Sequence, residues 1–220
     1  MKPWLALGTG ALLAGLLAGC GSDSDNDPAP TPDTSTPDHI RLSFLGRHGT
    51  GIFDGSAAEI TAFDPVSGRA FVVNAEKGAL DVLDMSDPAN PTLEQTLTTS
   101  DIAVGTEVNS VAVQGGLVAL AIEAPAKTDP GYMAIYDATT LERLGMVQVG
   151  AQPDMVTFTP DGNSVLTANE GEPNDDYSVD PEGSISVIDI TDPTNPQPRT
   201  ADFSAYNGQE ASLRQSGVRI

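Results

Sequence analysis

The chain has 220 residues, 31 of them acidic and 10 basic, and its formal net charge is −21. This negative charge would repel the phosphates of a nucleic acid, and there is no excess of basic residues to offset the repulsion, so we expect no nucleic-acid partner. The single cysteine leaves no partner for an intramolecular disulfide, so packing or bound ions must stabilise the domain.

The N-terminal segment has the pattern of a bacterial lipoprotein signal. Lys2 precedes an apolar run that starts at Trp4 and ends at Leu17-Ala18-Gly19-Cys20. The run is short and rich in glycine, which suits a signal segment better than a membrane span. We therefore expect residues 1–20 to be this signal, cleaved before Cys20, with a lipid on the Cys20 thiol. An ordinary secretory peptide with an incidental cysteine is the alternative.

The predicted lipid on Cys20 implies a place and a partner. It would anchor the protein to the membrane of the bacterial cell envelope, outside the cytoplasm. Gly21 follows the cysteine, where lipoproteins retained at the inner membrane carry an aspartate, so the outer membrane is favoured. Residues 21–38 are mainly Ser, Asp, Pro and Thr, a composition that predicts a disordered tether.

Residues 39–220 are predicted to form short strands joined by turns, beginning with an alternating strand at 40–45. One apolar segment then recurs three times about every 50 residues, a period typical of propeller blades. Its copies are Leu80–Met85, Met133–Ala138 and Ile185–Ile190. A second alignment, of residues 63–74 with residues 158–169, gives a further strand, tight turn and strand in each repeat.

Four strands in each repeat of this length predict an all-β fold, a β-propeller of four-stranded antiparallel blades. About three blades are present, near 54–101, 102–150 and 151–203. A closed propeller needs roughly four to eight blades, so we expect an incomplete ring and read the chain as an N-terminal fragment of a longer protein. The strand at 40–45 would complete a final blade, and residues 217–220 would begin another strand.

Three motifs carry a family resemblance. They are Gly51-Ile52-Phe53-Asp54, the run from Pro153 to Gly162, and the acidic run from Ala168 to Ser184. Over about residues 40 to 220 the chain resembles the choice-of-anchor I family of secreted bacterial proteins, which is related to the LVIVD-repeat propellers. The resemblance implies a seven-bladed propeller held outside the cytoplasm by one of several anchors, here Cys20. Some members carry an alkaline-phosphatase label, but the family assigns no activity to particular residues.

The acidic loop in the third repeat is the best candidate site. It is ten residues longer than the corresponding loop of the first repeat, and loops enlarged on a rigid scaffold often carry function. Its oxygen ligands suit Ca²⁺. They are Glu170, Glu172, Asn174, Asp175, Asp176, Asp180 and Glu182. The alternative is a solvated acidic loop, ordered by its prolines and Tyr177.

A second candidate set lies where the first strand of each blade begins. Glu59, Asn109 with Glu107, and Asp154 would face the central channel, where a polar ring can hold a ligand or a metal. Hydrogen bonding of backbone groups between adjacent blades is the structural alternative, which we favour. Arg47-His48-Gly49-Thr50 resembles a histidine phosphatase motif, but the only other histidine is His39, so we interpret it as coincidence.

Two functions remain after the sequence is considered. The first is a lipid-anchored, extracytoplasmic propeller that binds an unknown ligand or protein partner, with stabilising calcium. The alternative is a metal-dependent hydrolase of the alkaline-phosphatase type. In that case Glu170, Glu172, Asp175 and Asp176 would hold a metal that activates water or clamps phosphate oxygens.

Overall fold

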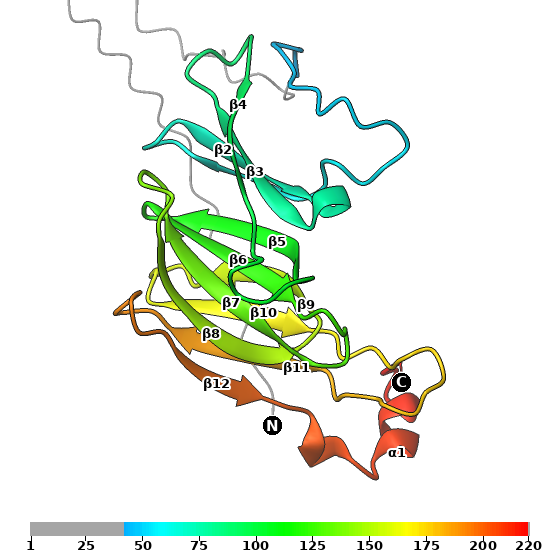
Figure 1. Cartoon of the computed structure of the whole chain (residues 1–220). Coiled ribbons are helices and arrows are strands. Elements are labelled where there is room, and N and C mark those ends of the chain that lie inside the picture. Colours follow the sequence, from blue (N-terminus) through cyan, green and yellow to red (C-terminus); the bar gives the residue numbers. More distant parts are fainter. Residues whose placement is uncertain (1–41, 220) are drawn as a thin grey trace, which may run out of the picture. The chain divides into compact units, whose positions relative to one another are not determined.

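In the computed structural model, which describes residues 42–219, twelve strands form three four-stranded sheets (Figure 1). The first sheet contains β1 (Thr61–Asp64), β2 (Arg69–Asn74), β3 (Ala79–Asp84) and β4 (Thr92–Leu97). The second contains β5 (Glu107–Gln114), β6 (Leu117–Glu123), β7 (Pro130–Asp137) and β8 (Arg143–Ala151). The third contains β9 (Pro153–Phe158), β10 (Ser164–Asn169), β11 (Ser184–Asp189) and β12 (Gln197–Ala201).

Each sheet is an antiparallel meander in which every strand pairs with the next one along the chain. The prediction of an all-β, propeller-type fold with about three four-stranded blades is confirmed. The predicted signal at 1–20, the tether at 21–38 and Cys20 lie outside the described residues.

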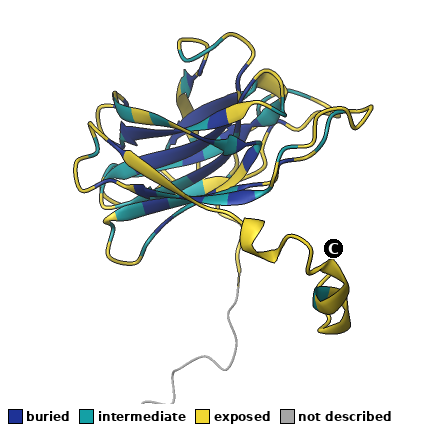
Figure 2. Cartoon of the chain, turned by 90° about the horizontal axis from the view of Figure 1, so that it is seen from below, coloured by how far each residue is buried: buried dark blue, intermediate teal, exposed yellow. Residues whose placement is uncertain are grey.

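The hydrophobic cores lie between successive blades. One cluster joins Phe71 and Val82 of the first blade to Leu120 of the second, and another joins Ile135 of the second blade to Ile188 of the third. Alternate strand residues point to opposite faces, so the second blade contributes to both cores. Full burial of such a side chain stabilises the fold by about 1.5–3 kcal/mol. Figure 2 shows the buried strands grouped in the sheet region and the C-terminal segment exposed.

The aspartate that ends each repeated strand caps the turn that follows it. The Oδ1 atoms of Asp84, Asp137 and Asp189 accept hydrogen bonds from backbone N–H groups two residues later. Backbone hydrogen bonds, including one from the N–H of Thr140 to Asp137, are the main reason why the pKa of each carboxyl group lies below its usual value. The repeated aspartate therefore ends its strand and shapes the next turn.

Two strand predictions at the ends of the domain are wrong for the residues that the structure describes. Residues 42–45 and 217–219 form no strand. A strand needs a neighbour to satisfy its backbone groups, and within 42–219 no strand pairs with either segment.

The other elements are η1 (Ala75–Lys77), η2 (Ser204–Tyr206) and α1 (Glu210–Gln215). Over residues 42–219, no helix is long and apolar enough to cross a membrane.

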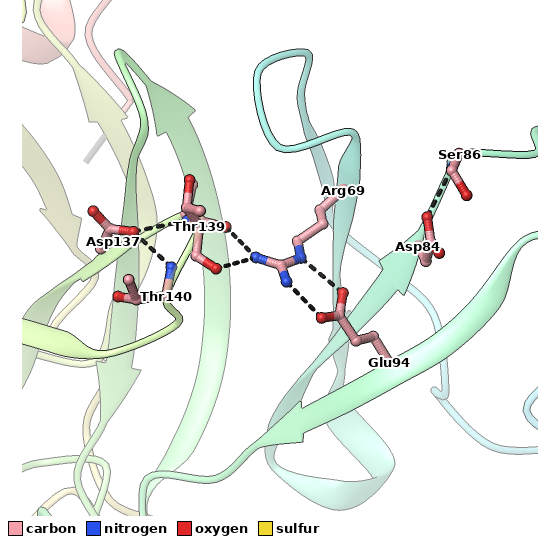
Figure 3. Close-up of polar contacts among 8 residues, drawn as sticks. Arg69, Asp84, Ser86, Glu94, Asp137, Thr139 and Thr140 are labelled. Atoms are coloured by element: carbon pink, nitrogen blue, oxygen red, sulfur yellow. Dashed lines mark hydrogen bonds and ion pairs between the residues drawn. The ribbon is translucent and has the colours of Figure 1, made fainter.

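Arg69 at the start of β2 fastens the first blade to the second (Figure 3). Its guanidinium forms a two-point contact with the Glu94 carboxylate on β4, in which Nε donates over 2.7 Å. The same guanidinium donates from Nη1 to the carbonyl oxygens of Ala138, over 2.8 Å, and Thr139, in the turn that Asp137 caps. Arg69 thus joins two strands of one blade to the turn of the next.

Replacement of Arg69 should weaken this blade junction. We expect Arg69→Ala to lower the free energy of unfolding by about 1.5–3 kcal/mol, because it leaves a carboxylate and two carbonyl groups without their charged donor. Arg69→Lys should cost nearly as much, since an ammonium cannot make the two-point contact. Urea unfolding followed by circular dichroism measures the change. Arg199→Ala, on exposed β12, is the matched control and should stay within about 0.5 kcal/mol of the natural chain.

Candidate functional site

The loops between the second and third strands differ greatly in length among the blades. They span residues 75–78 in the first blade, 124–129 in the second and 170–183 in the third. The third loop contains all seven predicted metal ligands and extends beyond the ends of β10 and β11 (Figure 1). The insertion predicted from the sequence therefore lies on a pair of strands whose positions the core already fixes.

Gln152, between β8 and β9, holds the base of this long loop. Its backbone carbonyl accepts a hydrogen bond from the N–H of Glu170 over 2.9 Å. Its side-chain amide accepts from the N–H of Glu172 over 3.1 Å and donates to the Glu172 carboxylate over 3.2 Å. Gln152 has a φ of 51°, in the left-handed region that non-glycine residues rarely adopt. Three hydrogen bonds to the loop accompany this strained backbone.

Lys127, in the shorter loop of the second blade, forms an ion pair with Glu172. The distance from Nζ to Oε2 is 3.2 Å. The hydrogen bond from Gln152 and the contact with Lys127 hold the pKa of Glu172 below its usual value. An open groove of about 510 Å³ lies between the two loops. We call it the loop groove, and it is lined by Ala126, Lys127, Thr128, Asn174, Asp175 and Asp176.

The tip of the long loop is closed by hydrogen bonds within the loop itself. The Asn174 N–H donates to the Val179 carbonyl over 3.0 Å, and the Asn174 Oδ1 atom accepts from the Val179 N–H over 3.1 Å. The Asp176 Oδ1 atom accepts from both the backbone N–H and the hydroxyl of Ser178. These contacts give the tip a defined shape. The Oδ1 atoms of Asn174 and Asp176 already accept hydrogen bonds within the loop.

A group of carboxylates gathers at the base of the loop, where the blades meet. Glu170 is exposed, but neighbouring protein atoms remove part of the water around its carboxyl group and so raise its pKa, and the negative charges of Asp154, Glu172 and Glu123 raise it further. We call these four residues the acidic rim. They come from the end of β6, the start of β9 and the long loop, so the second and third blades both contribute.

The predicted channel-facing residues have different surroundings. Asp154 belongs to the acidic rim. The Asn109 amide donates to the Glu123 carboxylate over 2.9 Å and to the Pro153 carbonyl over 3.3 Å, so it links the second blade to the third. Glu59 lies before β1, where its backbone N–H donates to the Val73 carbonyl over 3.1 Å. Glu107 is paired with Glu123 across β5 and β6.

Sequence reasoning did not identify Glu123, Lys127 or Gln152. The repeat itself contained a signal for Glu123, since the strand registers place it at the position of Glu170 in the neighbouring blade. Gln152 carried no comparable signal, because its role depends on a left-handed backbone and on a loop that lies 18 or more residues away.

The structure places the predicted metal ligands in different parts of the long loop. Glu170 and Glu172 lie at the base of the loop, whereas Asn174 and Asp176 take part in the tip. Asp175 lines the loop groove, and Asp180 and Glu182 are exposed on the returning half of the loop. Among residues 42–219, no three His, Cys, Asp or Glu side chains are placed to share a metal ion. The metal-dependent hydrolase therefore gains no support from this arrangement.

The chain resembles several solved structures, and it spans about two fifths of the length of the three described next. The putative 6-phosphogluconolactonase of Bacteroides uniformis has a TM-score of 0.51 and 19% identity, over 69% of this chain and 42% of that one. Its Bacteroides fragilis counterpart has a TM-score of 0.48 and 18% identity, over 68% and 38%. The periplasmic gluconolactonase of Pseudomonas aeruginosa has a TM-score of 0.49 and 17% identity, over 67% and 39%.

The likeness to the Bacteroides uniformis protein supports the propeller fold and nothing further, because the identity is low. No curated protein matches the chain. The choice-of-anchor I domain matches residues 59–220, which is most of the sequence and includes all three blades. Choice-of-anchor domains are typical of extracellular and secreted bacterial proteins. On this match, the chain belongs to the choice-of-anchor I domain family.

Proposed function

We propose that this protein is a lipid-anchored, extracytoplasmic β-propeller module that binds a ligand at the loop groove and the acidic rim. The observation that carries the proposal is the long loop of the third blade, which is fixed at its base by Gln152 and Lys127. A rigid scaffold that holds an enlarged polar loop beside a groove is a common arrangement for ligand binding.

The charges of this region favour a ligand that carries positive charge. Glu123, Asp154, Glu170 and Glu172 form the acidic rim, and Lys127, the cation that lines the loop groove, is already paired with Glu172. Desolvation is the main reason why the pKa of Glu170 is raised, and a bound cation would offset the charge repulsion that adds to it. A cationic group on a partner molecule and a metal ion share this chemistry.

Calcium stabilisation stays a prediction, and Ca²⁺ is the simplest probe of the acidic rim. Because the described side chains form no ready group of three ligands, binding requires the loop to rearrange. We therefore expect a dissociation constant on the order of 10⁻⁴–10⁻³ M, the range of weak extracellular calcium modules.

Calorimetry with added Ca²⁺ tests this prediction. At 100 times the dissociation constant, the stability should rise by about 2.7 kcal/mol, with a corresponding increase in Tm. The double variant Asp154→Asn, Glu170→Gln should lose this response, whereas Glu142→Gln, an exposed residue of the second blade, should keep it. A Tm that does not change with Ca²⁺ would remove calcium from the proposal.

The raised pKa of Glu170 also predicts a pH effect without any ligand. The folded state disfavours ionisation of the Glu170 carboxyl group, so this group stabilises the fold only while it is protonated. Its full contribution to the free energy of unfolding is present below the pKa that it has in the unfolded chain. That stability is lost as the pH rises through the folded pKa. We expect Glu170→Gln to raise Tm at pH 7 and to leave it almost unchanged at pH 3.5. Equal shifts at both pH values would contradict the electrostatic account.

The anchor can be tested at Cys20. In the natural host, Cys20→Ser should prevent lipid attachment and move the protein from the membrane fraction to the soluble extracytoplasmic fraction. Ser22→Ala is the control and should remain with the membrane. Mass spectrometry of the mature N-terminal peptide reports the lipid directly. An unmodified Cys20 thiol in the natural protein would show that the anchor is wrong, while leaving the binding site untouched.

A further inference from the structure

Asn207 and Gly208 lie between η2 and α1, in the segment that follows the third blade. Both residues are exposed, and Figure 2 shows the helical part of this segment exposed as well. They form the only Asn-Gly sequence of the chain. Glycine has no Cβ atom to shield its backbone nitrogen, and a Cβ atom built on Gly208 would meet nothing within 4 Å. The Gly208 nitrogen is therefore accessible to the Asn207 side chain.

The side-chain amide of Asn207 is unusual in its hydrogen bonding. Every other asparagine side chain among residues 42–219 takes part in a hydrogen bond. The Asn207 amide forms none, although the backbone of the same residue is bonded. Asn90 and Asn195 are also followed by proline, whose nitrogen carries no hydrogen. The sequence and the hydrogen bonding thus select the same asparagine independently.

From these two features, we propose that Asn207-Gly208 is a site of spontaneous deamidation through a cyclic succinimide. The Gly208 nitrogen loses its proton to hydroxide and attacks the Asn207 Cγ atom. The new N–Cγ bond closes a five-membered ring, the Cγ–Nδ2 bond breaks, and the Nδ2 atom takes a proton from water and leaves as ammonia. Water then opens the ring at either of its carbonyl carbons, which gives aspartate or isoaspartate. No electrons are transferred, and water and hydroxide are the only co-reactants.

Glu210, the first residue of α1, holds the attacking group in an unreactive position. The Gly208 N–H donates to the Glu210 Oε1 atom over 2.9 Å. The Asn207 backbone is extended, with φ −58° and ψ 132°, which turns the Gly208 nitrogen away from the position that it takes in a closed ring. Ring closure requires rotation about the Asn207 Cα–C bond, and this rotation breaks the contact with Glu210. Glu210 is thus a positioning residue that slows the reaction.

The products would alter the turn that leads into α1. In isoaspartate the main chain runs through Cβ and Cγ, so it is longer by one carbon atom. This carbon lies inside the turn that the Gln209 N–H closes on the Tyr206 carbonyl over 3.0 Å. Both products also place a carboxylate beside Glu210, in a hollow that the two side chains line. Amide hydrogens of α1 should therefore exchange faster in converted than in fresh protein, and equal exchange would contradict this effect.

Storage of the whole chain in mildly alkaline buffer, followed by peptide mass spectrometry, tests the proposal. Residue 207 should gain the mass of an amide-to-acid conversion much faster than Asn163, which is also exposed but is hydrogen-bonded to Asp161. Both isomers should form, and an isoaspartyl methyltransferase should label the isoaspartate. Conversion no faster than at Asn163, or aspartate without isoaspartate, would overturn the proposal.

Variants in α1 test the restraint by Glu210 separately. Glu210→Ala should accelerate the conversion about 2- to 10-fold, the factor that corresponds to the net free energy of one hydrogen bond. Gln215→Ala, at the other end of α1, is the matched control and should keep the rate of the natural chain. An unchanged or slower conversion in Glu210→Ala would show that the restraint is wrong.

Discussion

Burial of one blade face against the next is the interaction on which the rest of the structure depends. A single four-stranded sheet leaves both of its faces in water, and only contact between sheets removes its apolar side chains from solvent. Ile135 and Leu120 show this division, since they lie in different cores on opposite faces of the second blade. Strand register is fixed as a result, because a shift of one residue would exchange the two faces.

Polar contacts then determine how neighbouring blades meet at their ends. At one end of the sheets, Arg69 donates to the turn of the second blade, and Gln114 donates to the Thr159 carbonyl of the third over 3.2 Å. At the other end, Asn109 donates to the Pro153 carbonyl. These side chains donate hydrogen bonds to backbone carbonyl groups in partly buried positions between blades. The loops beyond them are then free to differ in length, from four residues after β2 to fourteen after β10.

The sequence predicted the fold well because the repeat records the blade period directly. Asp84, Asp137 and Asp189 occupy one position in three blades, and each caps a turn. Of the strand predicted at 40–45, the described residues 42–45 form no strand, because strand formation depends on a neighbouring strand that residues 42–219 do not supply. Alternation of apolar and polar residues shows that a segment can form a strand, but it does not identify the strand with which the segment would pair.

The site was predictable in composition but not in arrangement. The excess of acidic residues in the long loop is visible in the sequence, whereas the meeting of Glu170 with Asp154 and Glu123 depends on how two blades pack. That packing is a tertiary effect, and no local pattern reports it. The repeat could have aligned Glu123 with Glu170, because the pairing of the second and third strands gives both residues the same position in their blades.

Gln152 connects the long loop to the junction between the second and third blades. This residue is the short link from β8 to β9, and its unusual backbone geometry is maintained while its amide holds Glu172. Because Gln152 is the one residue between β8 and β9 and also bonds Glu172, a substitution at this position would affect the base of the long loop and the connection between two blades together.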